Sequence, residues 1–209
     1  MRKTTTSVLL AGLIAIDLAF IVLDLIYTHT RDLGSMYSLG MDRGYGEYYQ
    51  YLKLAAILFM LGVMAWRERA LFYAGWFLVF TYLLIDDAFL VHETYGLYVA
   101  ERVPIADRLG LRGRDFGELL ITMFAGGILI VTLSVAYLRS DADHRALTHG
   151  LVGLILVLAF FGVLIDMIHE IFRDTIVFDA LGTLEDGGEL VVMSVITWFV
   201  FRNYHPEGV

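Results

Sequence analysis

Carboxylates and histidines inside apolar segments are the residues of this 209-residue chain that could do chemistry. Two such groups occur, one near the end of the apolar run at 71–92 and one near the end of the run at 147–169. Their members are Asp86, Asp87, His92, Glu93, Asp166, His169 and Glu170. An ionised carboxylate in hydrocarbon is destabilising by several kcal/mol unless it is paired or binds a cation. These residues are therefore candidates for a functional site.

Three Gly-Glu pairs bring a further acid to each third of the chain. They are Gly46-Glu47, Gly117-Glu118 and Gly188-Glu189, spaced 71 residues apart twice over, and each opens an apolar run. Self-similarity at a fixed period predicts a repeated structural unit. We expect each unit to be an apolar helix, a polar loop and a second helix that starts near Gly-Glu. A glutamate near a helix start also favours the helix dipole, so simple capping is the alternative role.

The first helices of the repeats also resemble one another. Asp24 lies 23 residues before Glu47, as Asp166 does before Glu189, and the segment 16–22 is similar to 85–91. Each copy therefore places acids at one end of its first helix and a glutamate at the same end of its second. Asp17 and Asp24 have a structural alternative, because they could hydrogen-bond between helices of the first copy.

Composition predicts a membrane protein. Hydrophobic residues make up 58% of the chain and its mean hydropathy is +0.70, whereas soluble domains have roughly 45–50% apolar residues. Apolar runs that approach the ~20 residues needed to cross a bilayer lie near 7–27, 51–66, 71–92, 118–138, 147–169 and 190–203. The predicted fold is all-α, a polytopic membrane protein with six transmembrane helices.

The spacing of the repeat predicts how these helices are arranged. An even number of helices in each copy keeps all copies in one orientation, so we expect three parallel helical hairpins around a pseudo-threefold axis. Residues 1–209 form a single membrane domain, with repeats at approximately 1–66, 67–139 and 140–209.

Charge and composition restrict the location and the partners. The short loops and chain ends on one side carry Arg2, Lys3, Arg67, Arg69, Arg139, Arg145 and Arg202. The positive-inside rule then predicts cytoplasmic termini in a cell membrane and acidic helix ends on the extracytoplasmic side. The net charge of −8 argues against a nucleic-acid partner. The absence of cysteine excludes disulfides and thiolate chemistry.

The convergence of acids and histidines predicts a metal site, most plausibly dinuclear. The expected ligands and their close partners are His92, Glu93, Glu118, His169, Glu170, Glu189, Asp87 and Asp166. Secondary candidates are Asp24, Glu47, Asp86, Asp115 and Asp186. Imidazole and carboxylate ligands favour iron or manganese, with zinc possible.

This set of ligand types resembles the di-iron and di-manganese carboxylate sites of ferritin-like bundles, where two helices supply Glu and two supply Glu-x-x-His. Asp166-x-x-His169 is similar to that motif, with Asp in place of Glu. The segment around His92 departs from it, because Phe89 stands three residues earlier.

Three classes of function fit these residues. The first is a metal-dependent enzyme, an oxidoreductase or a hydrolase, that acts on a lipid-soluble or small substrate. The second is a cation or proton transporter, although the apolar stretches at 57–61 and 154–158 give a path no polar steps. The third is a non-catalytic membrane subunit whose acidic or metal cluster is structural or docks a partner subunit.

Overall fold

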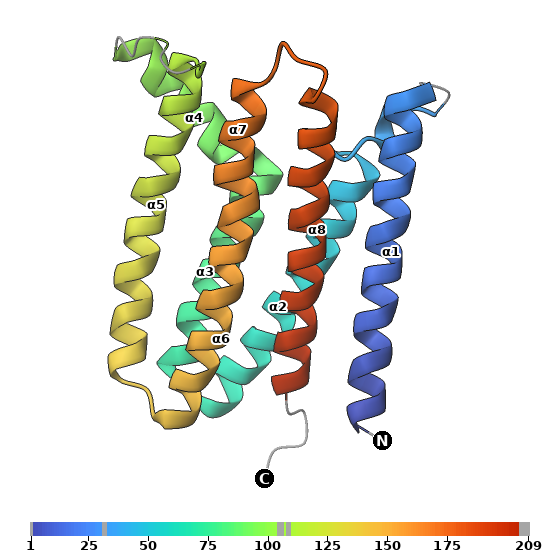
Figure 1. Ribbon diagram of the computed structural model, residues 1–209. Helices are drawn as coiled ribbons and strands as arrows, with labels where there is room; N and C mark the ends of the chain where they lie inside the picture. The colour runs from blue at the N-terminus through green and yellow to red at the C-terminus, as the bar shows by residue number, and fades with distance from the viewer. Residues whose placement is uncertain (1, 31–32, 104–106, 108–109, 205–209) are drawn as a thin grey trace.

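The computed structural model describes residues 2–30, 33–103, 107 and 110–204. All regular elements in these ranges are helices. They are α1 (Arg2–Thr30), the 3-10 turn η1 (Ser35–Tyr37), α2 (Tyr45–Glu68), α3 (Leu71–Phe89), α4 (Val91–Arg102), α5 (Gly113–Leu138), α6 (Ala142–Ala159), the π-helical segment η2 (Phe160–Ile165), α7 (Asp166–Ile171) and α8 (Phe178–Asn203). The long helices stand side by side in one bundle, and α6, η2 and α7 form one continuous column (Figure 1).

Five helices in the described ranges are long and apolar enough to cross a membrane. They are Thr4–Thr30, Tyr45–Glu68, Leu71–Phe89, Gly113–Leu138 and Ala142–Ile171. Although α8 is equally long, Asp179, Glu185, Asp186 and Glu189 fall within its first half. The all-helical character predicted from the sequence is confirmed, and these five apolar helices suggest a membrane protein. Six membrane-spanning helices are not confirmed.

The predicted threefold repeat is not confirmed either. Hairpin repeats would place α1 beside α2, as α3 lies beside α5 and the α6–α7 column beside α8. Instead, α8 is the main neighbour of α1. Asp24 on α1 accepts a hydrogen bond from Thr183 on α8 at 2.6 Å, and a Cβ atom added at Gly187 would meet Ile21 at 3.0 Å. Close packing at Gly187 and this polar contact hold α1 against α8.

The apolar core occupies the half of the bundle nearest the α2–α3 and α5–α6 loops. It is built mainly from α2, α3 and α8, and its fully buried members include Ile57, Trp76, Phe80, Met193 and Ile196. Leu151 adds α6 to the same cluster. Burial of these large side chains closes this part of the bundle with apolar atoms.

The outer surface of the bundle is strongly apolar. Val22 on α1, Phe124 and Val131 on α5, and Leu156 on α6 are each more than half exposed. Large exposed apolar surfaces on a protein mark contact with a membrane or a partner. A lipid bilayer fits these faces, because the exposed side chains lie on the same helices that are long enough to span it.

Candidate functional site

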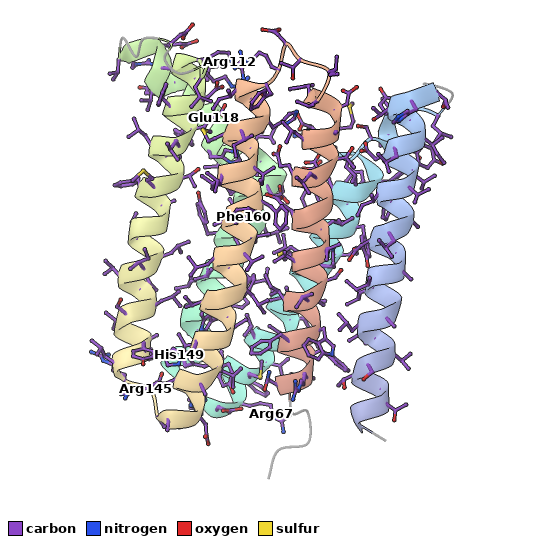
Figure 2. The ribbon with its side chains drawn as sticks, in the orientation of Figure 1. Arg67, Arg112, Glu118, Arg145, His149 and Phe160 are labelled. Atoms are coloured by element: carbon purple, nitrogen blue, oxygen red, sulfur yellow. The ribbon has the colours of Figure 1, made fainter. Side chains whose placement is uncertain are left out.

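A cavity of about 690 Å³ lies between α2, α3, α4, α5, the α6–α7 column and α8. This volume is within the ~300–1,000 Å³ of small-molecule pockets. Leu54, Val79, Ile155 and Met193 line it toward the middle of the bundle. Its other wall carries acids and histidines, at the end where Arg112 and Glu118 lie in Figure 2. Arg67, Arg145 and His149 lie at the opposite end.

Most of the site residues predicted from the sequence lie around this one cavity. All eight principal candidates line it, namely Asp87, His92, Glu93, Glu118, Asp166, His169, Glu170 and Glu189. Of the secondary candidates, Glu47, Asp86 and Asp186 line it as well. Asp24 and Asp115 do not belong to its lining. Asp24 binds the backbone N–H of Leu39 at 2.9 Å, and Asp115 pairs with Arg112 at 2.8 Å.

His92 is held by Asp86. One Asp86 oxygen accepts the backbone N–H of His92 at 3.0 Å, and the other lies 2.9 Å from the ring Nδ1. Burial opposes protonation of the ring, but the hydrogen bond and charge of Asp86, with Glu93 and Glu118 nearby, outweigh it and raise the pKa of His92 to about 8. The contact at Nδ1 leaves Nε2 for another partner.

His169 has a similar arrangement. Its Nδ1 lies 2.8 Å from Glu185 on α8, and its ring is tilted against Phe178 with centroids 4.1 Å apart. Its Nε2 is buried and has no hydrogen-bond partner within the described residues. A buried nitrogen without a partner is unfavourable, so each such atom calls for an explanation.

Arginines neutralise the acids nearest the end of the bundle. Arg114 on α5 bridges Glu93 on α4, at 2.8 Å, and Glu118 on its own helix. Despite this contact, burial of Glu93 raises the pKa of its carboxyl. Arg112 and Arg173 both contact Glu170, at 2.8 and 2.9 Å. Three of the predicted metal ligands, Glu93, Glu118 and Glu170, are therefore in ion pairs.

Four acids deeper in the cavity lack such partners. We call them the inner carboxylates: Asp87 on α3, Asp166 on α7, and Asp186 and Glu189 on α8. Across the described part of the chain, none of their side chains forms an ion pair or accepts a hydrogen bond. The charge of Glu189 interacts with those of Asp186, Asp87 and Asp166. Like charges this close repel one another unless a cation or protons neutralise them.

The side chains in their present positions do not form a complete metal site. No group of three or more histidine, aspartate or glutamate residues in the described ranges is placed to hold a metal ion. The cavity gathers ligand types of the kind predicted, in two His–carboxylate pairs and four inner carboxylates. The metal itself remains a prediction.

A π-helical segment directly precedes Asp166, one of the inner carboxylates. η2 ends at Ile165, directly before Asp166, and π-helical insertions often occur at functional sites because they shift the following side chains around the helix. Gly162 lies inside this segment, and a Cβ atom there would overlap Oε1 of Glu189. The absence of a side chain at Gly162 therefore lets Glu189 reach the backbone of the α6–α7 column.

The glycines of the three Gly-Glu pairs have a packing role. A Cβ at Gly46 would meet Leu39 at 2.7 Å, one at Gly117 would overlap the backbone of Gly96, and one at Gly188 would overlap Phe161. Each glycine lets another segment approach, while the glutamate that follows it lines the cavity. Glu47 accepts hydrogen bonds from the N–H of Arg43 and the hydroxyl of Tyr51, so capping contributes in the first copy.

Two features of the site were not predicted from the sequence. One is the pairing of Glu185 with His169; the other is the neutralisation of three acids by Arg112, Arg114 and Arg173. The spacing of Arg114 and Glu118, four residues apart on a helix, is a signal that favours an ion pair. The contact between Arg112 and Glu170 joins residues 58 apart in the chain, so no local pattern indicates it.

The fold and site together define an all-helical protein with five described helices long and apolar enough to cross a membrane, and with an acidic and histidine-lined cavity in its bundle. A family model described as a domain of unknown function (DUF8692) matches residues 5–203, and the chain belongs to that family. No curated protein matches the chain. No solved structure matches it either.

Proposed function

We propose that this protein binds a divalent transition metal in the cavity and uses it as a metal-dependent enzyme on a lipid-soluble or small substrate. Asp87, Asp166 and Glu189 would supply carboxylate ligands, and His92 and His169 would supply imidazoles through Nε2. This ligand set favours iron or manganese, with zinc as the third choice. The observation that carries the proposal is the pair of carboxylate-held histidines on a cavity with four unpartnered acids.

The two histidines support metal binding through their second nitrogens. A metal-ligating histidine usually gives its other ring N–H to a carboxylate or a carbonyl, which fixes the tautomer and increases the basicity of the ligand. Asp86 and Glu185 occupy that position at 2.9 and 2.8 Å from Nδ1. The unpartnered Nε2 of His169 has the chemistry of a ligand atom.

The charge distribution supports neutralisation of the inner carboxylates by a bound cation, because the nearby arginines are engaged elsewhere. Arg112, Arg114 and Arg173 are already engaged by Glu93, Asp115, Glu118 and Glu170. The inner carboxylates form no ion pair with an arginine or a lysine in the part of the chain that the structure describes. A divalent ion among them would offset both their mutual repulsion and the unfavourable removal of charge from water.

The shape of the cavity favours a site over a passage. Beyond Leu54 and Met193 the bundle is filled by apolar side chains such as Ile57 and Ile196, both 0% exposed. A transport path would need polar groups or water on that side. Arg67, Arg69, Arg139 and Arg145 lie in or next to the loops of this closed end. The positive-inside rule therefore supports a cytoplasmic location for this end and an extracytoplasmic one for the acidic end.

A metal in this position would polarise a substrate oxygen or activate a bound water. The protein's own residues would orient the imidazoles, restrict the coordination and exclude bulk water through the apolar lining. Oxidation at iron or manganese and hydrolysis at zinc are both consistent with these ligands, and the identity of the metal separates the two.

Measurement of the metal content of the purified protein tests the proposal directly. The protein is purified without added chelator and its Fe, Mn and Zn are quantified by inductively coupled plasma mass spectrometry. We expect a stoichiometric transition metal in the unmodified protein and a loss of most of it in Glu189→Gln. Glu68→Gln is the matched control, because it makes the same change on a glutamate at the opposite end that is 47% exposed. Equal metal content in the two variants, or no metal in the unmodified protein, overturns the proposal.

A further inference from the structure

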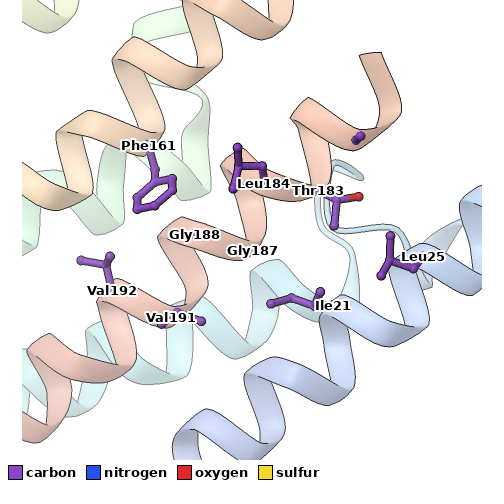
Figure 3. Close-up of a pocket in the computed structure, with 10 residues that line it drawn as sticks. Ile21, Leu25, Phe161, Thr183, Leu184, Gly187, Gly188, Val191 and Val192 are labelled. Atoms are coloured by element: carbon purple, nitrogen blue, oxygen red, sulfur yellow. The ribbon is translucent and has the colours of Figure 1, made fainter. Parts of the chain in front are cut away.

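A second, apolar pocket lies on the other face of α8. It measures about 470 Å³ and is formed by Ile21 and Leu25 of α1, Phe161 of the α6–α7 column, and α8 residues from Ala180 to Val192. Figure 3 shows the α1 and α8 side chains facing each other across it, with Phe161 on the third side. Thr183 supplies the one polar side chain of this lining.

One helix separates this groove from the acidic cavity. On α8, Leu184, Gly187, Gly188 and Val191 line the groove, whereas the neighbouring Glu185, Asp186 and Glu189 line the cavity. Phe161 packs against Gly188, and the next residue, Gly162, is the one that Glu189 approaches. The groove therefore lies beside the acids, with only the glycine-containing part of α8 and the Phe161 ring between.

The groove is continuous with the surface that faces the bilayer. Leu25 and Leu184 belong to its lining and are 40% and 49% exposed. On α1 the same outer surface continues through Leu18 and Val22, both more than half exposed. In a membrane, the molecules in contact with such a surface are lipids, so an acyl chain can enter the groove without crossing water.

Hydrogen bonding marks one end of the groove. The hydroxyl of Thr183 donates to Asp24 at 2.6 Å, and the same carboxylate accepts from Ser38 at 3.2 Å. These polar groups stand toward the acidic end of the bundle, whereas Val191 and Val192 continue the apolar wall toward its middle. An elongated molecule with one polar end and one long apolar chain matches this distribution.

We propose that the groove binds the acyl chain of a membrane lipid. The acyl chain lies against α1 and α8, and the polar end lies at the level of Thr183 and Asp24. Binding of the lipid in the groove does not depend on a metal in the neighbouring cavity. The pocket volume is within the range of ~300–1,000 Å³ that suits ligands of this size.

Photo-crosslinking tests the groove. The protein in nanodiscs of phosphatidylcholine is irradiated with a palmitic acid that carries a diazirine in its chain, and the labelled peptides are mapped by mass spectrometry. We expect labels concentrated on 21–25 of α1 and 180–192 of α8. Leu184→Trp fills the groove and should reduce this labelling by about threefold or more, which corresponds to a loss of about 0.65 kcal/mol of binding or more, whereas Leu184→Ala should keep it.

Leu120→Trp is the matched control, because Leu120 lies on the outer surface of α5 and is 52% exposed, close to the 49% of Leu184. It should leave labelling of the groove unchanged. Labels spread evenly over α1, α5 and α8, or equal labelling in Leu184→Trp and Leu120→Trp, would overturn the groove assignment. Groove labelling in a protein that holds no metal would keep the lipid site and refute the metal enzyme, so the two failures are distinguishable.

Discussion

The acids of α1 and the inner carboxylates give the same signal in the sequence but have opposite surroundings. Asp17 is 0% exposed and pairs with Lys53 at 3.2 Å. Asp24 is 4% exposed and accepts hydrogen bonds from Ser38, Leu39 and Thr183. The inner carboxylates have no such donors among the described residues. An acid in an apolar segment therefore has a structural or a ligand-binding role according to the partners that the fold brings to it.

The environment of Lys53 makes this comparison sharper. Its ammonium is 2% exposed and donates to Asp17, to the carbonyl oxygen of Leu190 at 2.7 Å and to Ser194 at 3.3 Å. Lys53 thereby connects α2 with α1 and α8. Its contact on α8, Leu190, is the residue that follows Glu189. Asp17 on α1 is thus neutralised by a lysine, whereas the inner carboxylates line a cavity.

The largest effect is expected at this buried ion pair. Asp17→Leu leaves Lys53 charged and without its counter-ion, and breaking a buried pair in this way destabilises a protein by about 3–5 kcal/mol. We expect a strong fall in the melting temperature measured in detergent. Adding Lys53→Met to the same protein should restore most of the loss. If Asp17→Leu melts like the unmodified protein, α1 is not held by this pair.

Removal of metal is expected to have the next largest effect. A ligand at 100 times its dissociation constant stabilises the folded state by about 2.7 kcal/mol, so a chelator should lower the melting temperature of the loaded protein. In chelator, Glu189→Gln should melt no lower than the unmodified protein, because it removes one of several repelling charges. Equal melting temperatures with and without chelator would show that the inner carboxylates bind no stabilising metal and have a structural role, as the acids of α1 do.

Asp86→Asn should lower the metal affinity, although Asp86 is not itself a proposed ligand. Asp86 fixes the ring of His92 through both of its oxygens, and loss of such an orienting carboxylate reduces metal affinity by about 10–100-fold. The affinity is measured by competition with a fluorescent chelator. Asp115→Asn, which alters an acid outside the cavity lining, should bind metal as the unmodified protein does; equal weakening in both variants would indicate a general loss of structure.

The smallest effect is a dependence on pH in the metal-free protein. His92 has a pKa of about 8 in the folded protein, above its value of 6.5 in a free chain. The protonated ring therefore stabilises the fold fully below pH ~6.5, and this contribution is lost as the pH rises through ~8. It is on the order of 1 kcal/mol after allowance for the exposed third of the ring.

The comparison of melting temperatures for the unmodified protein and His92→Gln, in chelator between pH 6 and 9, tests this point. The difference between them should be greatest at the acidic end and decrease with rising pH. A difference that is constant, or that increases with pH, would show that the contact with Asp86 does not stabilise the charged ring.

Local patterns in the sequence predicted the helices and the residue types of the cavity. Apolar runs identify the long helices because a bilayer demands length and hydropathy, and the clustering of Asp87, His92, Asp166 and His169 indicates where polar groups must meet. The neighbour of α1 was not predictable in the same way. It depends on contacts between Ile21 and Gly187 and between Asp24 and Thr183, residues far apart in the chain.

The sequence also did not predict which acids are paired with arginines and which are unpaired. Arg112 reaches Glu170 across 58 residues, so the count of acids and arginines alone does not tell which acids are neutralised. Glu189 approaches Gly162 inside the π-helical segment that precedes Asp166. Neither contact leaves a periodic signal, because each joins residues far apart in the chain.

X-ray absorption spectroscopy at the edge of the metal found in the purified protein tests the central claim, that the inner carboxylates and the two histidines are metal ligands. We predict a shell of oxygen and nitrogen atoms at about 2.0–2.2 Å and the outer-shell scattering of imidazole, with the imidazole signal reduced in His169→Gln. A metal surrounded by oxygen alone, with the same spectrum in His169→Gln, or a protein without metal, would contradict this account.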